Sequence, residues 1–586
     1  MKTFVTNFFD NSLFSGSQWQ DKSVMIIVPH EDDELNLTGA TICNLLQHKI
    51  KVRVVFCTNA DRFDRGELRV REGIASCKAL GIPDEDVIFL GYCNTFRINK
   101  NLHFYNGAAD DIIVTSTRNM TETYCPPEKP EFCFLHHKIH HKFTKKNFRY
   151  DIKEVLTMYK PDVIFVNDFD RHPDHRAVSF IFEEALAKIL QTPGNAYTPE
   201  VYKGFAYNGA FLGKRDFYAS LNLAGEERAS AEYSNNSAYD TDFPPYDWDK
   251  RLRLPVPVNF LSRTLKGSCL YPAIRAYLSQ GLIHNAKRII NSDQIFWRRR
   301  TDSLTYQAKI SVSSGNGKVL NDFKLADCTD ILKEPADLDA GTWIPDKRDP
   351  YKEIFLQFAK PQKITRIILH GNVDFNSRVL TGFLTFSNGK HLEFGSLRPG
   401  AKSTIIDFPL MENIVSVKLT LLNIQGPKAG LNEIEIYEHK IAPTLFSFIK
   451  IRIKDTFAYD YWVNNKTEDL YMNLYAYDAQ GAHFYEGRIP KNYIFTYVGG
   501  KNFKVKGSMV YLQKGFKEGV VRVTDALHPE LFDQIVIHRK SLWELFRFKF
   551  VQAYDAIFTR IEHLVKNKYY KKRIKEKNPD LGKIPE

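Results

Sequence analysis

The sequence predicts an α/β domain with a mostly parallel sheet, followed by two all-β sandwich domains and a C-terminal amphipathic basic helix. Between residues 23 and 207, β-branched apolar runs alternate with helical patterns, an order typical of a parallel sheet covered by helices on both faces. From residue 305, short alternating strands separated by Gly, Pro, Asn and Asp replace that order. From residue 541, apolar residues recur at helical spacing and end in the basic segment KNKYYKKRIKEK.

The domain boundaries are predicted where the pattern of strand-like and helix-like segments changes. A chain of 586 residues is too long for one core, because single cores stop growing at roughly 250–300 residues. We expect the α/β domain over 1–304 with an insertion at about 93–147, sandwiches over 305–440 and 441–540, and the helix and tail over 541–586. The insertion is too long for an ordinary connection between a strand and a helix, and such insertions often cover a site.

Composition and charge exclude several classes of protein. The chain is 43% hydrophobic and 26% charged, and no window reaches the roughly 20 apolar residues of a membrane-spanning helix. Its N-terminus lacks the apolar core of a secretory signal, so we expect a cytoplasmic protein, or one in peripheral contact with the inner face of the membrane. The formal net charge of +12 favours an anionic partner, but charge alone does not choose among them, and we expect no nucleic acid.

Two groups of histidines and carboxylates each follow a predicted strand. The segment PHEDDE comes directly after SVMIIV, and HPDH comes shortly after DVIFVND. In open α/β sheets, ligands bind at the carboxyl ends of the strands, so both groups are expected at one edge of the sheet. The competing interpretation is that each group only caps the helix that follows it. Two such groups at one edge favour a metal site.

The residue types in these groups suit hydrolytic chemistry. A catalytic zinc ion commonly takes three protein ligands and leaves a fourth position for water, and His30, Asp33 and His175 could supply that set. Asp32 and His172 are then spare. A neighbouring carboxylate can act as general base, and a second histidine can donate a proton or a hydrogen bond to a developing oxyanion.

The two motifs, about 140 residues apart in a Rossmann-like alternation, resemble the PIG-L/LmbE-like family of metal-dependent N-acetylglucosaminyl de-N-acetylases. Glu31 stands where the family has proline, and every metal and base position is filled. The resemblance implies zinc, or another divalent metal such as Fe2+, as cofactor. The residues it implies are His30, Asp33 and His175 as ligands, Asp32 as general base, His172 as acid or oxyanion partner, and Asp174 as the group that orients His172.

A third segment, ELRVREGIASCKALGI, resembles the second helix of the same family, with Arg69 and Glu72 at its Arg-x-x-Glu positions. This resemblance implies that Arg69 contacts an anionic part of the substrate. The alternative is that Arg69 is a solvated residue at the start of a helix, balanced by Glu67 and Glu72.

The C-terminal half carries weaker signals. The Trp343–Asp349 loop and the Gly430–Tyr437 strand resemble a discoidin (F5/8 type C), galactose-binding-like domain, which implies either glycan or lipid-headgroup binding or a packing role. The 441–540 unit is immunoglobulin-like only in its strand pattern. The terminal helix fits either an interfacial helix attracted to anionic lipid or a helix docked on the preceding sandwich.

The histidines of HHKIHHK, in the insertion, are interpreted as part of a basic, solvated loop and not as a second metal site, because the sequence nearby shows no matching carboxylates.

Together these features predict a zinc-dependent hydrolase that removes the N-acetyl group from an N-acetylated amino sugar of N-acetylglucosamine type. Its substrate would lie in a glycoconjugate, or in a polysaccharide or glycolipid precursor, and a phosphorylated or lipid-linked acceptor agrees with the basic charge. Two alternatives stay open: a non-catalytic glycan-binding protein with a degenerate hydrolase domain, and a metal-dependent hydrolase of an ester or phosphoester bond.

Overall fold

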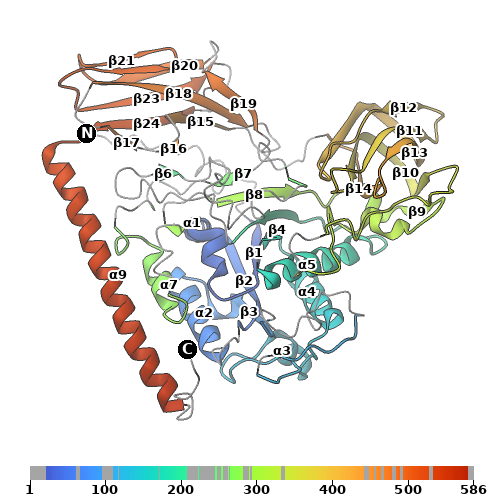
Figure 1. Ribbon diagram of the computed structural model, residues 1–586, viewed down its shortest axis with the longest axis horizontal. Coiled ribbons are helices and arrows are strands. Elements are labelled where there is room, and N and C mark those ends of the chain that lie inside the picture. Colours follow the sequence, from blue (N-terminus) through green and yellow to red (C-terminus); the bar gives the residue numbers. More distant parts are fainter. Residues whose placement is uncertain are drawn as a thin grey trace.

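The structure is a computed structural model with a central α/β domain, two all-β units and one long helix (Figure 1). The residues that it describes are 21–60, 66–94, 110–116, 118–170, 172–206, 222–223, 245–246, 252–254, 260, 262, 264–281, 289–290, 294–331, 337–440, 448–453, 457–458, 460–463, 467–477, 483–488, 493–526, 529 and 532–577. Within these residues no helix is both long and apolar enough to cross a membrane.

The central sheet has seven strands in the order β3-β2-β1-β4-β5-β8-β7. Its strands are β1 (Ser23–Val28), β2 (Lys51–Thr58), β3 (Val87–Tyr92), β4 (Val163–Asn167), β5 (Glu200–Gly204), β7 (Leu252–Leu254) and β8 (Gln294–Arg299). The first five are parallel, and β8 runs antiparallel to β5 and β7. The chain adds β2 and β3 on one side of β1 and β4 and β5 on the other. The strand order therefore reverses between β1 and β4, and ligands of such sheets bind at that point.

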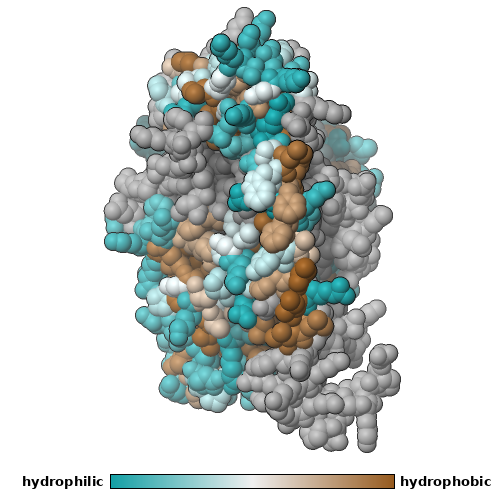
Figure 2. All heavy atoms as spheres, turned by 90° about the vertical axis from the view of Figure 1, so that its left-hand side faces the viewer, coloured by the Kyte–Doolittle hydropathy of each residue, from teal (hydrophilic) through white to brown (hydrophobic). Residues whose placement is uncertain are grey.

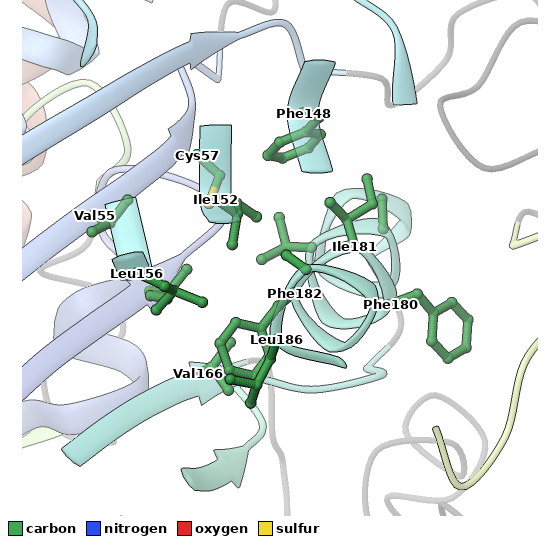
Figure 3. Packing of buried hydrophobic residues seen from close by; sticks show 14 of the residues in the cluster. Val55, Cys57, Phe148, Ile152, Leu156, Val166, Phe180, Ile181, Phe182 and Leu186 are labelled. Atoms are coloured by element: carbon green, nitrogen blue, oxygen red, sulfur yellow. The ribbon is translucent and has the colours of Figure 1, made fainter. Parts of the chain in front are cut away.

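Helices cover both faces of this sheet. They are α1 (Asp33–Gln47), α2 (Gly66–Leu80), α3 (Phe132–His137), α4 (Lys145–Tyr159), α5 (Pro173–Leu190) and α7 (Tyr271–Ala276), with short 3-10 turns at Asp84–Asp86, Leu304–Gln307 and Gly317–Asn321. Alternate residues of β1 serve different cores: Met25 belongs to the core under α4 and α5, and Ile26 to the core under α1 and α2. Figure 3 shows the first core, where Ile152 of α4 and Phe182 of α5 gather beside Val166 of β4. Because both faces are buried, the strands β1, β3 and β4 are almost continuously apolar.

The unit after residue 304 is built on two long strands. Its strands are β9 (Lys309–Val312), β10 (Glu353–Gly371), β11 (Arg378–Phe386), β12 (His391–Phe394), β13 (Ser403–Gln425) and β14 (Leu431–Tyr437). The ladder between β10 and β13 shifts register between Gln357 and Arg366, so both strands bend around a shared core. The two segments that resemble a discoidin domain meet here, because Trp343 and Leu431 exchange backbone hydrogen bonds. The sandwich and discoidin assignments stay predictions.

The next unit has two sheets that share one core. Its strands are β15 (Phe448–Ile453), β16 (Phe457–Ala458), β17 (Asp460–Val463), β18 (Glu468–Tyr477), β19 (His483–Arg488), β20 (Tyr493–Val498), β21 (Phe503–Lys506), β22 (Met509–Leu512), β23 (Glu518–Asp525) and β24 (Phe532–Arg539). Leu470 and Val510 of one sheet and Val521 and Ile535 of the other lie in one buried cluster. β16 also pairs with β6 (Asn222–Leu223) of the first domain. The immunoglobulin-like assignment stays a prediction.

The C-terminal helix, α9 (Leu542–Lys577), runs along the edge of the molecule beside α7 and α2 (Figure 1). Residues 578–586 of the predicted helix and tail lie outside the described residues. The buried side chain of Asp555 accepts a hydrogen bond from the Leu265 backbone, and Phe558 packs against Tyr271. The sequence leaves open a helix docked on the preceding sandwich. That interpretation is wrong, because these contacts of α9 are with the α/β domain.

Candidate metal centre and active site

The two predicted groups of residues meet at the point where the strand order reverses. His30, Asp32 and Asp33 occupy the turn from β1 into α1, and His172 and His175 lie at the start of α5, shortly after β4. Asp32 has φ 115°, a left-handed conformation that a non-glycine residue adopts only when its surroundings hold it there. Such strain is concentrated at functional sites. Parallel pairing of β1 with β4 brings the two turns together.

Three predicted ligand atoms converge at this edge. His30 Nδ1 lies 3.0 Å from Asp33 Oδ2 and 3.2 Å from His175 Nε2, and His175 Nε2 lies 3.1 Å from the same Asp33 oxygen. All three side chains are buried. A ring nitrogen of His172 also lies within 4.8 Å of those of His30 and His175, but this ring is more exposed.

The orientation of the two rings indicates that a cation belongs between them. His30 Nε2 donates to Asp174 Oδ2 at 2.9 Å, and His175 Nδ1 donates to Asp170 Oδ2 at 2.6 Å. Because carboxylates only accept, the outer nitrogens carry the hydrogens in the neutral rings that a metal requires, and the inner nitrogens then present lone pairs. In that state two lone pairs and the Asp33 carboxylate face one another at about 3 Å. Asp33 Oδ1 is also buried without a hydrogen-bond partner. These donors fit a divalent metal of the zinc type.

The charge of the site without metal agrees with this assignment. Burial alone would lower the pKa of His175, but Asp170 and Asp33 outweigh it and raise the pKa well above its ordinary value. A proton on this ring thus takes the place of a cation. Binding of a metal would displace that proton, so metal affinity should increase with pH.

Asp32 sits beside these ligands and is held by Arg69. Arg69 Nη2 donates to Asp32 Oδ1 at 3.1 Å and also to the backbone oxygen of Glu31. Burial raises the pKa of Asp32 to about 6, although Arg69 opposes the shift. The alternative of a solvated Arg69 is wrong, because this side chain is buried against Glu31 and Asp32. Its predicted contact with the substrate stays a prediction.

Glu31, the residue that departs from the family pattern, has a buried place of its own. Its carboxylate faces Arg69 Nε at 3.5 Å, and burial raises its pKa to about 8. Gly73 of α2 provides the space, since a Cβ atom there would lie 3.1 Å from Glu31 Cγ. The absence of a side chain at Gly73 therefore leaves room for the Glu31 side chain.

His172 caps α5 through its Nδ1 atom. Its Nδ1 accepts the backbone N–H of Asp174 at 3.2 Å, so the neutral ring carries its hydrogen on Nε2. Burial and the neighbouring His30 lower its pKa well below the ordinary value. Asp174 binds His172 through its backbone N–H and His30 through its carboxylate, so its predicted role in orienting His172 stays a prediction. Asp174 Oδ2 lies 3.7 Å from His172 Nδ1, which is occupied by the helix cap, and 2.9 Å from His30 Nε2, so its main partner is His30.

Sequence reasoning missed two supports of the site. Asp170, which orients His175, could have been found as the acidic residue shortly before HPDH, because metal-bound histidines commonly donate to a carboxylate. Glu34 accepts from Ser76 Oγ at 2.9 Å and from the Tyr277 hydroxyl at 2.7 Å. Tyr277 is 243 positions from Glu34, and no local pattern connects them.

Three of the four histidines of HHKIHHK have carboxylate partners, contrary to the expectation from sequence. His137 Nε2 lies 2.7 Å from Glu154 Oε1, His141 Nδ1 lies 2.8 Å from Asp151 Oδ1, and His140 pairs with Glu131. Ligand atoms of Cys133, His141 and Asp151 lie within 4.8 Å of one another. However, Asp151 Oδ2 accepts from the Tyr92 hydroxyl at 2.6 Å, and Thr123 Oγ1 contacts Cys133 Sγ at 3.2 Å. Hydrogen bonds therefore satisfy this cluster without a cation.

Comparison with known proteins agrees with the motifs. Residues 25–186 match the family model described as GlcNAc-PI de-N-acetylase (PIG-L), and residues 304–437 match a domain of unknown function (DUF7402). Among solved structures, the chain resembles N,N'-diacetylchitobiose deacetylase from Pyrococcus horikoshii, with 19% identity, a TM-score of 0.22 and coverage of 35% of this chain. The matched region spans 65% of that deacetylase, less than two thirds of its length.

Two further solved structures show similar levels of likeness. The family 32 CBM of NanJ from C. perfringens, in complex with galactose, has 12% identity, a TM-score of 0.18, and coverage of 22% of this chain and 93% of that one. The zinc-inhibited form of teicoplanin deacetylase Orf2 has 15% identity, a TM-score of 0.21, and coverage of 31% and 67%. TM-scores of this size do not establish a shared fold. Residues 25–186 are thus similar to the PIG-L family model, and both histidine motifs lie within the matched residues.

Proposed function

We propose that this protein is a metal-dependent hydrolase that removes the acetyl group from an N-acetylated amino sugar of N-acetylglucosamine type. The observation that carries the proposal is the convergence of His30 Nδ1, His175 Nε2 and the Asp33 carboxylate within 3.0–3.2 Å of one another. The PIG-L match over residues 25–186 supports the class of bond. The sugar would belong to a glycoconjugate, or to a polysaccharide or glycolipid precursor.

His30, Asp33 and His175 would hold the metal, which we propose to be zinc, with Fe2+ as the alternative. When bound, a divalent ion of this kind supplies a polarised amide carbonyl and a water molecule that ionises near neutral pH. Asp174 and Asp170 keep the two rings oriented by accepting from their outer nitrogens.

Asp32 is the proposed general base. Arg69 fixes its Oδ1 at 3.1 Å, so Oδ2 is the oxygen that takes a proton from the attacking water. A carboxylate with a pKa of about 6 is largely ionised at neutral pH yet basic enough to accept that proton. The same carboxyl group can then return the proton to the departing amine. Arg69 is therefore proposed as a positioning residue for Asp32.

His172 is the proposed partner of the oxyanion. Its Nδ1 is occupied by the backbone N–H of Asp174, so its Nε2–H is the group that can donate. Its lowered pKa keeps the ring neutral, which favours donation of a hydrogen bond over transfer of a proton.

The experiment is to measure acetate release from N-acetylglucosamine conjugates by the metal-loaded protein, next to O-acetyl and phosphoester analogues. We expect wild type and His141→Ala to release acetate from the amide substrates, and Asp32→Asn and His175→Ala not to. Hydrolysis of the esters or phosphoesters alone would establish the rival hydrolase. Metal-loaded wild type that releases nothing from any N-acetyl substrate would refute the proposal. Adding a phosphate or lipid to the acceptor tests whether the basic charge of the chain contributes to recognition.

A further inference from the structure

Helix α9 carries a row of exposed large apolar side chains, here called the α9 stripe. Its members are exposed by between 45% (Tyr554) and 80% (Leu542). They are Leu542, Trp543, Phe546, Phe550, Tyr554, Ile557, Ile561, Leu564 and Val565. Most follow one another at intervals of three or four residues, so they lie on one face of the helix. Figure 2 looks onto this side of the molecule and shows apolar side chains running along the helix. Continuous apolar surface of this kind marks an interaction site.

The stripe is not the face by which α9 attaches to its own chain. Asp555 is fully buried, and its Oδ2 accepts from the Leu265 backbone N–H at 3.2 Å. Phe558 packs at an angle against Tyr271, with 5.9 Å between ring centroids, and Lys266 Nζ lies 5.8 Å from the centroid of the Phe558 ring. These contacts hold α9 on the α/β domain. The stripe is a second apolar face that remains exposed.

Charge distinguishes the partners that could cover this face. The sequence of α9 contains ten Lys or Arg and four Asp or Glu residues, and one of the acidic residues, Asp555, is buried against the domain. A second copy of α9 would bring the same positive excess against itself. An anionic lipid surface would neutralise it, and juxtamembrane basic residues are attracted to such surfaces.

The residue types of the stripe favour the same partner. Trp543, Phe546, Phe550 and Tyr554 form its N-terminal half, and aromatic side chains are enriched where a membrane meets water. Exposed Arg547, Lys549 and Arg560 accompany them. An amphipathic helix with aromatic and aliphatic residues on one side and Lys or Arg on the other lies in the plane of the membrane. The described helices cannot cross a membrane, which agrees with a helix that lies along its surface.

We propose that the α9 stripe inserts into the interfacial region of an anionic membrane and holds the protein on its surface. The binding does not depend on the proposed hydrolase chemistry. It has a structural consequence for the site, because the segment that receives α9 at Leu265 continues to Tyr277, whose hydroxyl donates to Glu34. Glu34 directly follows the proposed ligand Asp33. A docked α9 would therefore set the position of the site relative to the lipid surface.

The test is cosedimentation of the full chain with vesicles of phosphatidylcholine, with or without phosphatidylglycerol. The variant Trp543→Ser/Phe546→Ser/Phe550→Ser removes the aromatic part of the stripe. The matched control, Tyr497→Ser/Val498→Ser, removes two exposed apolar side chains of β20, which are 47% and 58% exposed. All five side chains are exposed, so we expect both variants to fold, with circular dichroism spectra like that of wild type.

We expect wild type and the control to bind the anionic vesicles, less so at high salt, and the stripe variant to bind at least about tenfold more weakly. Equal binding of wild type and the stripe variant, or no binding by wild type, would overturn the proposal. Sedimentation velocity without lipid should show monomers. A wild-type dimer that the stripe variant loses would assign the stripe to a second copy of the chain and would also overturn it.

Discussion

Histidines meet carboxylates in two regions of this protein, at the β1/β4 edge and in the insertion, and the two regions differ in where the lone pairs point. At the edge, Asp174 and Asp170 take the outer N–H groups of His30 and His175, so the inner nitrogens converge on Asp33. In the insertion, His137, His140 and His141 each pair with a carboxylate of their own, as His141 does with Asp151.

This difference shows that the number of histidines in a segment does not make a metal site. The HHKIHHK segment of the insertion contains more histidines than either motif at the edge, and the distances between its histidine nitrogens and carboxylate oxygens are as short. However, its polar atoms are satisfied by donors such as the Tyr92 hydroxyl. A cation stabilises an arrangement in which acceptors face one another, and only the edge has that arrangement among the described clusters.

The largest expected effect is on kcat, and it should distinguish two buried aspartates, Asp32 and Asp151. Asp32→Asn should lower kcat by about 10²–10⁴-fold, because an amide cannot take the proton of the attacking water. Its metal content should stay that of wild type. Asp151→Asn is the matched control, and its kcat should remain close to that of wild type. Steady-state kinetics with metal analysis of the same samples checks this. An Asp32→Asn enzyme with full kcat would exclude Asp32 as the base.

The next effect concerns the carboxylates that orient histidines. Asp170→Asn should weaken metal binding by about 10–100-fold, since it removes the acceptor that orients His175. Asp151→Asn, which changes the partner of His141, should leave metal affinity unchanged. Competition with a chromophoric chelator measures both. Equal affinities for wild type and Asp170→Asn would show that Asp170 does not support a ligand.

The pH dependence tests Asp32 together with Arg69. Asp32 must be ionised to act as a base, so kcat/KM should fall about tenfold per pH unit below the pKa of Asp32. This pKa is about 6 without metal, and a bound cation should lower it because it favours the carboxylate. Arg69 lowers the pKa of Asp32, so Arg69→Met should move this acidic limb to higher pH. An acidic limb that does not move would assign it to another group.

The smallest effect concerns stability in the insertion. His141→Ala should lower the free energy of unfolding by about 1–3 kcal/mol, because it removes a hydrogen bond to the buried Asp151. The hydrogen bond that His141 donates to Asp151 raises the pKa of His141, so this pair stabilises the fold most below the ordinary pKa of histidine and less as pH rises through the folded value. The loss should therefore be greater near pH 6 than near pH 9 in urea denaturation. An equal loss at both values would contradict the assigned charge.

Much of the α/β domain could be predicted because its signals are local. The buried strands are apolar runs, and His30 and His172 come shortly after two of them, so their meeting follows from parallel pairing. The contact of the Asp174 carboxylate with His30 could not be predicted, because it depends on which nitrogen of His172 caps α5. Tyr277 supports Glu34 from a distant segment, and only the folded chain connects them.

The expectation that the histidines of the insertion have no carboxylates nearby is wrong for a different reason. These carboxylates were present in the sequence, with Asp151 ten residues after His141, but their pairing depends on how α4 packs beside the HHKIHHK segment. For α9, the sequence predicted the helix and its apolar residues but not that Asp555 and Phe558 attach it to the α/β domain. In both cases the sequence shows which residue types are present but not which residues they contact in the folded chain.

The most direct test of the central claim is the metal content of purified wild type, His175→Ala and His141→Ala, measured by inductively coupled plasma mass spectrometry after dialysis against zinc. If His30, Asp33 and His175 form the only metal centre among the described residues, wild type and His141→Ala should each retain about one equivalent, and His175→Ala almost none. Loss of the metal from His141→Ala, with retention by His175→Ala, would place the metal in the insertion and contradict the assignment.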